Sequence, residues 1–98
     1  MRTAITKQQV QALHDNYTGV KLIDIRSAPE HEKLHIPGTT NIPSDNLPER
    51  FSEFNKEETI VCVCNHGKER SQQAADLLYN AGFKNTFYLE GGTATWSI

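Results

Sequence analysis

TIVCVCNHGKERSQQAADLLYNAG, residues 59–82, is the stretch that decides the fold. Residues 59–64 form a near-continuous apolar run, the pattern of a central strand in a parallel sheet. A loop over residues 64–71 follows. Residues 71–81 then show helical spacing and stop at Gly82, which predicts a helix with these inward positions: Ala74, Ala75, Leu77, Leu78 and Ala81.

Strand and helix signals alternate on both sides of this stretch. Apolar runs predict buried strands at 20–25 (VKLIDI) and 86–89 (TFYL). Helical signals occur in four places: after a Thr6 cap, with Val10, Leu13 and Tyr17 on one face and Gly19 as the stop; over 27–34; after 44–46, with Leu47, Phe51 and Phe54 on one face; and from Gly91-Gly92 to Trp96. Residues 35–43 predict an extended, proline-punctuated loop. This alternation is typical of an α/β fold with a mostly parallel sheet.

Bulk composition predicts one small globular domain, residues 1–98. The chain is 37% hydrophobic and 22% charged, with a net charge of −2, so nothing favours nucleic acid or an anionic membrane as a partner. No apolar run approaches the roughly 18 residues of a membrane span. The N-terminus lacks the apolar region of a signal peptide. Two cysteines, Cys62 and Cys64, are too few and too close for a disulfide framework, which predicts a reducing, cytoplasmic setting.

Cys64 stands where the predicted strand ends and the loop begins. In parallel sheets, ligand sites lie at this edge. Loop amides and a helix N-terminus together form an anion-binding concavity, and Gly67 allows the backbone to turn tightly there. Lys68 and Arg70 add positive charge, and the Arg70 fork can bind two oxygens at once. We therefore expect a Cys64 thiolate, with a pKa below the free value of about 8.5, that faces an anionic substrate.

The other polar residues near Cys64 have simpler interpretations. Cys62 lies inside the strand, where nothing local activates it, so we interpret it as a core residue. His66 is a candidate for proton transfer, although a loop histidine is more often merely solvated. Glu69 is expected to face solvent. The histidines show no metal-ligand spacing, so no metal and no cofactor is expected.

Three motifs resemble the rhodanese domain. LIDIRSAPEHEKLHIPGTTNIP (22–43) is similar to the family's Asp-x-Arg, Glu and His-Ile-Pro-Gly pattern, CNHGKERS (64–71) resembles its active-site loop, and LEGGTATW (89–96) resembles its Gly-Gly-x-x-x-Trp ending. The resemblance implies a single rhodanese-like domain, with a five-stranded parallel sheet flanked by helices on both faces. It also implies a cysteine that carries sulfur as a persulfide.

The loop departs from the usual rhodanese pattern in length. Single-domain rhodaneses commonly read Cys-x-x-Gly-x-Arg-Ser, whereas Arg70 is the sixth residue after Cys64. Cys-x5-Arg is the spacing of cysteine phosphatases, and the cell-division-cycle phosphatases and related arsenate reductases resemble rhodaneses in fold. Val63, however, replaces the histidine that usually precedes the phosphatase cysteine. The spacing leaves open which anion the loop binds.

The sequence favours a sulfurtransferase that moves sulfur from thiosulfate or a persulfide donor to a thiol or cyanide through a Cys64 persulfide. Its expected partners are a small anionic sulfur donor and a thiol or protein acceptor. Asp24 and Arg26 are expected to brace the neighbouring loops, and Arg26 to pair with Glu30. The alternatives are a small phosphatase or arsenate reductase, and a non-catalytic sulfur-carrier or redox-sensing module. The predicted substrate-binding set is Asn65, His66, Gly67, Lys68, Glu69, Arg70 and Ser71.

Overall fold

The computed structural model describes residues 3–16 and 20–96, with only the backbone described for 14–16. These residues contain a five-stranded sheet with the strand order β1-β5-β4-β2-β3, in which every neighbouring pair is parallel. The α/β class and the five-stranded parallel sheet expected from the sequence are confirmed. The strands are β1 (Thr3–Ile5), β2 (Val20–Asp24), β3 (Thr40–Asn41), β4 (Thr59–Val63) and β5 (Thr86–Leu89).

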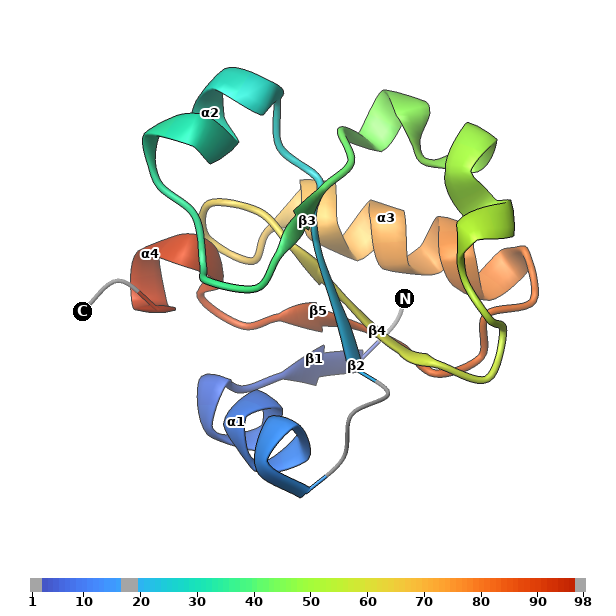
Figure 1. Cartoon of the computed structure of the whole chain (residues 1–98), viewed down its shortest axis with the longest axis horizontal. Helices are drawn as coiled ribbons and strands as arrows, with labels where there is room; N and C mark the ends of the chain where they lie inside the picture. Colours follow the sequence, from blue (N-terminus) through green and yellow to red (C-terminus); the bar gives the residue numbers. More distant parts are fainter. Residues whose placement is uncertain (1–2, 17–19, 97–98) are drawn as a thin grey trace.

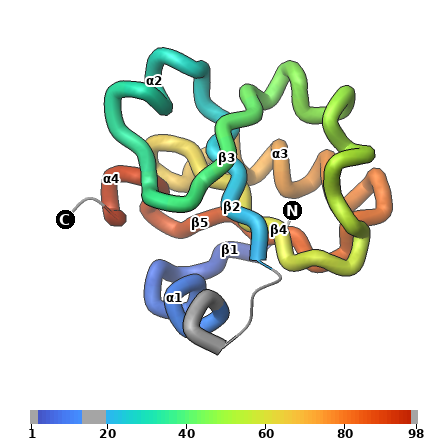
Figure 2. The backbone as a smooth tube through the Cα atoms, in the orientation of Figure 1, coloured from blue at the N-terminus to red at the C-terminus, as the bar shows by residue number. Residues whose placement is uncertain are grey.

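Helices connect these strands and cover the sheet, with α1 and α3 on opposite sides of it (Figure 1). Between β2 and β4 the chain forms α2, adds β3 at the edge of the sheet beside β2, and then forms two short 3₁₀ helices (Figure 2). Among the described residues, no helix has the length and apolar character needed to cross a bilayer. The helices are α1 (Lys7–Asn16), α2 (Ala28–Lys33), the 3₁₀ helices η1 (Ser44–Asn46) and η2 (Pro48–Glu53), α3 (Glu69–Asn80) and α4 (Gly92–Trp96).

Alternate residues of β4 face opposite layers of the core. Ile60, Cys62 and the following Cys64 pack with the inner face of α3. Val61 and Val63 pack instead with residues of α1, β1 and β5. Because both faces of β4 are fully buried, its sequence is continuously apolar, as expected of a central parallel strand.

Four local predictions differ from the structure. Leu77 is 41% exposed, since Ala74, Ala75 and Leu78 occupy the inner face of α3. This helix begins at Glu69, two residues earlier than the periodicity indicates. The segment 44–54 forms η1 and η2 instead of one helix, and β3 forms inside the predicted 35–43 loop. The predicted roles of Tyr17 and Gly19 concern positions outside the described residues.

Candidate active site

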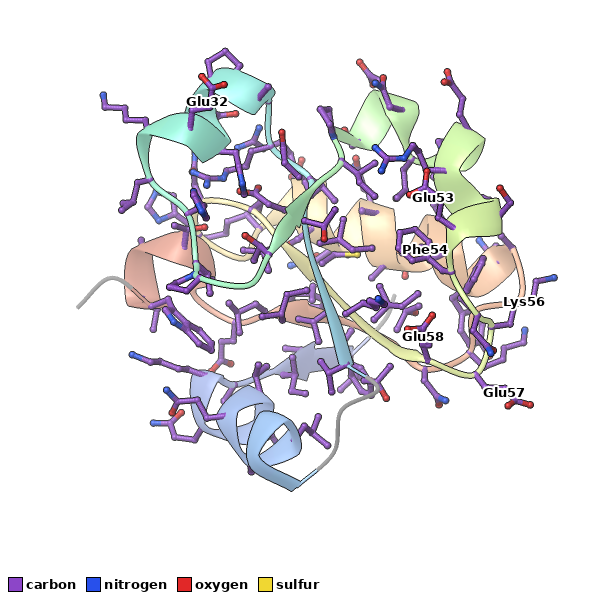
Figure 3. The ribbon with its side chains drawn as sticks, in the orientation of Figure 1. Glu32, Glu53, Phe54, Lys56, Glu57 and Glu58 are labelled. Carbon is purple, nitrogen blue, oxygen red and sulfur yellow. The ribbon has the colours of Figure 1, made fainter. Side chains whose placement is uncertain are left out.

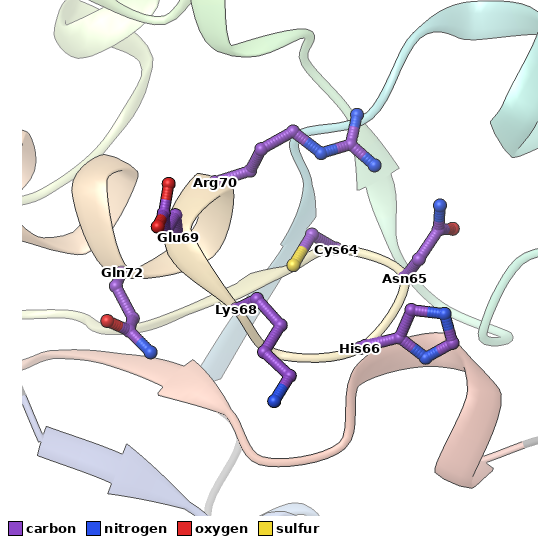
Figure 4. Close-up of a pocket in the computed structure, with 7 residues that line it drawn as sticks. All are labelled: Cys64, Asn65, His66, Lys68, Glu69, Arg70 and Gln72. Atoms are coloured by element: carbon purple, nitrogen blue, oxygen red, sulfur yellow. The ribbon is translucent and has the colours of Figure 1, made fainter.

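Cys64 lies at the floor of a cavity at the carboxyl end of β4 (Figure 4). The cavity has a volume of about 360 Å³. The Cys64 side chain is nearly buried, at 3% exposure, so a reagent must enter the cavity to reach its sulfur. Most of the predicted loop set surrounds this one cavity, whose lining residues are Cys64, Asn65, His66, Lys68, Glu69, Arg70 and Gln72.

The start of α4 holds the outer side of the loop. The backbone N–H of Thr93 donates to the Cys64 carbonyl at 2.9 Å, and that of Ala94 donates to the Asn65 carbonyl at 3.0 Å. Gly92 makes this approach possible, because a Cβ there would lie 2.3 Å from the Cys64 carbonyl oxygen. The LEGGTATW ending therefore has a direct structural role: it ties down the carbonyls of the loop.

Gly67 forms the turn of the loop, with φ at +69°. A Cβ at this position would lie 2.4 Å from the Leu89 carbonyl oxygen and 2.8 Å from the Gly91 nitrogen. Both the left-handed backbone and the lack of space exclude a side chain. Gly67 therefore shapes the loop without lining the cavity.

Hydrogen-bond donors converge on the Cys64 sulfur. Burial alone raises the pKa of this thiol, but the Ser71 hydroxyl and the backbone N–H groups of Ser71, Lys68 and His66 hold the pKa below its ordinary value. The Ser71 Oγ lies 3.2 Å from Sγ and is buried. The predicted lowering of the Cys64 pKa agrees in direction, and the side chain that contacts the sulfur is Ser71.

Cys62 has the opposite environment. Its side chain is fully buried, and burial, with a smaller effect of the Cys64 charge, raises the pKa of its thiol to about 12. Cys62 and Cys64 are both free thiols. The interpretation of Cys62 as a core residue fits this burial, because a neutral thiol at ordinary pH is a weak nucleophile.

Asp24 and Arg26 connect the end of β2 to the loop. The Arg26 guanidinium donates to the two Asp24 carboxylate oxygens at 2.9 and 2.7 Å, to the Asn65 side-chain oxygen at 2.9 Å and to the Leu34 carbonyl at 2.6 Å. His31 Nδ1 lies 2.8 Å from the Asp24 carboxylate. Burial raises the pKa of Asp24, but the hydrogen bonds from Arg26 and His31 lower it below its ordinary value. Through these contacts Arg26 joins the end of β2 to Asn65 of the loop, while the bracing role of Asp24 and Arg26 stays a prediction.

Arg70 lines the cavity, but its guanidinium binds a residue that the sequence did not place in the site. Its Nη1 and Nη2 atoms lie 3.3 and 3.4 Å from the two carboxylate oxygens of Glu30 on α2. In Figure 4 the Arg70 side chain extends past Cys64 toward the side of the loop where Asn65 lies. The expected pairing of Arg26 with Glu30 is wrong, because Asp24 binds the Arg26 fork and Arg70 takes the Glu30 carboxylate.

Besides pairing with Arg70, Glu30 caps the start of α2. The motif Ser27-Ala-Pro-Glu30 forms a capping box at the start of α2, so its helix-start signal was correct. Glu30 also accepts a hydrogen bond from the Asn65 amide at 3.2 Å. Arg70 first, and then the Ser27 backbone, lower the pKa of Glu30 to about 2. Glu30 could have been identified as a site residue from its position, because it is a carboxylate that follows β2 at the same edge of the sheet as the Cys64 loop.

The remaining loop side chains are exposed: His66, Lys68 and Glu69 reach solvent at the cavity rim. The exposed position of Glu69 agrees with expectation. Proton transfer by His66 stays a prediction. Among the side chains that the structure describes, those of residues 3–13 and 20–96, no group of three or more histidine, cysteine or acidic residues could hold a metal ion.

The fold and the site define a class: a five-stranded parallel α/β domain with a cysteine in an amide-lined loop after its central strand. The model of the rhodanese-like domain family matches residues 6–98. The chain therefore belongs to the rhodanese-like domain family, as the resemblance of its sequence predicted.

Relatives within the family span carriers and enzymes. YrkF of Bacillus subtilis, a proposed sulfur carrier protein, is 32% identical over 83 residues, which are 85% of this chain and 44% of YrkF. The thiosulfate sulfurtransferase GlpE of Pseudomonas syringae pv. syringae is 32% identical over 92 residues, which are 94% of this chain and 84% of GlpE. A solved rhodanese-like domain protein of Staphylococcus aureus has a TM-score of 0.85 at 29% identity, covering 96% of this chain and 90% of that one.

Proposed function

We propose that this chain is a sulfurtransferase whose nucleophile is the Cys64 thiolate. With thiosulfate as donor, the thiolate forms a bond to the outer sulfur, the sulfur–sulfur bond of thiosulfate breaks, and sulfite leaves with the electron pair. The product is a Cys64 persulfide. In the second step a thiol or cyanide attacks the outer persulfide sulfur, and Cys64 departs as the thiolate. No oxidant is needed, because the sulfur atom moves without a net change in the enzyme.

One observation carries this proposal: a nearly buried Cys64 sulfur with the Ser71 hydroxyl and three backbone N–H groups around it. Donors at this range stabilise a sulfur anion directly, whether it is the thiolate or the persulfide. The GlpE relatives are named as thiosulfate sulfurtransferases, which supports the same chemistry. We expect the sulfur donor to be a small anion or a persulfide, and the acceptor a thiol or a protein. The free thiols suit a reducing compartment such as the cytoplasm.

A non-catalytic carrier is the first alternative, and the likeness to YrkF favours it. In that case the Cys64 persulfide forms but passes only to a docked protein. Slow turnover with free thiosulfate, together with rapid sulfur uptake from a protein persulfide, would favour the carrier. Turnover of free thiosulfate with cyanide at a rate comparable to sulfur uptake from a protein persulfide would favour the enzyme.

A small phosphatase or arsenate reductase is the second alternative, because Arg70 has the Cys-x5-Arg spacing. Such chemistry needs the arginine fork on the oxyanion, whereas the Arg70 fork binds Glu30. Deleting Glu69, the first residue of α3, restores the shorter spacing and changes the chain only at the junction of the loop and the helix. We expect the deletion to raise thiosulfate turnover and to lower any hydrolysis of an aryl phosphate.

Mass spectrometry of the purified protein after thiosulfate treatment tests the first step. We expect a gain of about 32 Da, the mass of one sulfur atom, that cyanide removes. The matched variants are Cys64→Ser, which should show no gain, and Cys62→Ser, which should keep it. Ready hydrolysis of aryl phosphates by a protein that never gains sulfur would replace the sulfurtransferase with the phosphatase.

A further inference from the structure

A two-pronged ion pair joins Arg70, which lines the Cys64 cavity, to Glu30 on α2. The Arg70 guanidinium comes from the first turn of α3, and the Glu30 carboxylate comes from α2, which precedes it by forty residues. Both atom pairs are close, at 3.3 and 3.4 Å. The part of the loop best suited to bind two oxygens of an anion is therefore already bound to an internal anion.

Glu30 is held in this position by more than Arg70. Its Oε1 accepts a hydrogen bond from the Ser27 backbone N–H at 3.1 Å, which closes the capping box of α2. Its Oε2 accepts from the Asn65 amide at 3.2 Å, and Arg26 orients that amide from its other side. With a pKa of about 2, Glu30 is ionised at any ordinary pH. The carboxylate is thus a permanent and oriented competitor for the guanidinium.

The charges at the cavity mouth cancel. Lys68 and Arg70 supply two positive charges, and Glu69 and Glu30 supply two negative ones. The Cys64 thiolate then makes the site negative on balance. The side-chain charges therefore give a small dianion no net attraction beyond that of the backbone donors, and the dianion must displace Glu30 before it can use the Arg70 fork.

We propose that Glu30 is a specificity-determining residue that withholds Arg70 from small free dianions. The site then prefers a donor whose sulfur end carries at most one negative charge, namely a persulfide of a thiol or of a protein cysteine, over the thiosulfate dianion. This inference rests on the proposed sulfurtransferase function. In the favoured step the Cys64 thiolate bonds to the outer sulfur, the donor's sulfur–sulfur bond breaks, and the departing thiolate takes up the persulfide proton.

Anion binding tests this inference without any turnover. Iodoacetamide is neutral, so its rate with Cys64 reports how well added sulfate, an unreactive dianion, blocks the cavity. Glu30→Gln removes the charge but keeps a side chain that completes a capping box, so α2 should remain folded. Releasing Arg70 from a partly exposed ion pair should lower the half-protecting sulfate concentration by roughly two- to fivefold.

The control is Glu32→Gln, which removes the same charge from an exposed site on the same helix (Figure 3). We expect no change in sulfate protection for this variant. The gain from Glu30→Gln should vanish in an Arg70→Ala background. Equal gains in the Glu30 and Glu32 variants, a gain that survives Arg70→Ala, or no gain at all would each overturn the inference.

Kinetics then separate this inference from the proposed function. The KM for thiosulfate should fall by roughly two- to fivefold in Glu30→Gln. Sulfur uptake from 2-mercaptoethanol persulfide, whose organic part is neutral, should stay unchanged. If sulfate protection improves as expected but no variant ever gains sulfur, the role of Glu30 stands and the sulfurtransferase fails. If sulfur transfer proceeds but Glu30→Gln binds sulfate no better, the role of Glu30 fails alone.

Discussion

Ser71 provides a direct test of how the protein activates Cys64. Its hydroxyl lies 3.2 Å from the sulfur and also 3.2 Å from the Lys68 carbonyl oxygen. With a neutral thiol, Sγ donates to the hydroxyl and the hydroxyl donates to the Lys68 carbonyl; when Cys64 is a thiolate, the one hydroxyl proton turns to the sulfur. Ser71→Ala removes this donor and leaves the backbone donors in place. The Lys68 carbonyl still accepts from the Gln72 backbone N–H at 3.2 Å, so α3 should keep its first turn.

The size of the expected pKa change follows from the burial of Ser71 and Cys64. Ser71 is fully buried and Cys64 is 3% exposed, so water cannot replace the lost hydroxyl. A hydrogen bond to a charged group contributes about 1.5–3 kcal/mol, and one pKa unit corresponds to about 1.4 kcal/mol. Ser71→Ala should therefore raise the pKa of Cys64 by about one to two units. Below that pKa, the thiolate fraction and the alkylation rate should fall roughly ten- to a hundredfold.

The assay is the rate of iodoacetamide alkylation as a function of pH, with Cys62→Ser as the background so that one thiol is measured. The control is Ser52→Ala, which removes a hydroxyl from an exposed position on η2. Its midpoint should match that of the parent. A Ser71→Ala midpoint within a few tenths of a unit of the parent would refute the hydroxyl as a thiolate donor.

Three further outcomes are expected. Cys64→Ser should abolish sulfur transfer while Cys62→Ser keeps most of it, and equal loss in two folded variants would contradict the assignment. Gly67→Ala should lower the thermal midpoint far more than Gly38→Ala, because both have positive φ but only a Cβ at Gly67 meets backbone atoms, at 2.4 Å; equal shifts would contradict this. Glu30, with its pKa lowered to about 2, should stabilise the fold fully at pH values above its ordinary pKa near 4.3, and this stabilisation should be lost as the pH falls toward 2. In urea titrations, the difference in unfolding free energy between the parent and Glu30→Gln should therefore shrink over that pH range. A constant difference would exclude the linkage.

The elements with a repeating pattern could be predicted from the sequence. β4 is buried on both faces and α3 buries Ala74, Ala75 and Leu78, so each has a periodicity that the chain shows directly. β1 and β3 are only three and two residues long, too short for any period. They are strands because β5 and β2 offer them edges, which is a tertiary effect.

The segment 44–54 shows how a correct apolar pattern can mislead. Leu47, Phe51 and Phe54 do reach the core, as their spacing predicts. Pro48 lacks the backbone N–H that a continuous α-helix would need at that point. The chain therefore forms η1 before Pro48 and begins η2 at it. Burial of the face was predictable here, whereas the break between the two short helices falls at one residue.

The residues of the site also differ in how far the sequence predicts them. The distinction between Cys64 and Cys62 could be made from the sequence, because it depends on which thiol ends the strand and precedes the loop. The direction of the Arg70 side chain could not, because a long flexible side chain takes the direction of its partner. That partner, Glu30, is positioned by the cap of α2 and by the Arg26–Asn65 contact.

Loop length alone therefore does not determine which anion this protein binds. Counting residues from Cys64 to Arg70 gives the size of the ring of amides, but the charge available to a substrate depends on whether Arg70 is already neutralised. Glu30 belongs to a different helix and contributes nothing to the spacing of the loop. If Glu30 withholds Arg70 as proposed, two chains with the same Cys-x5-Arg loop would differ in substrate because of one carboxylate outside it. In this family, the residue opposite the loop arginine should be compared before the loop spacing is used to infer a substrate.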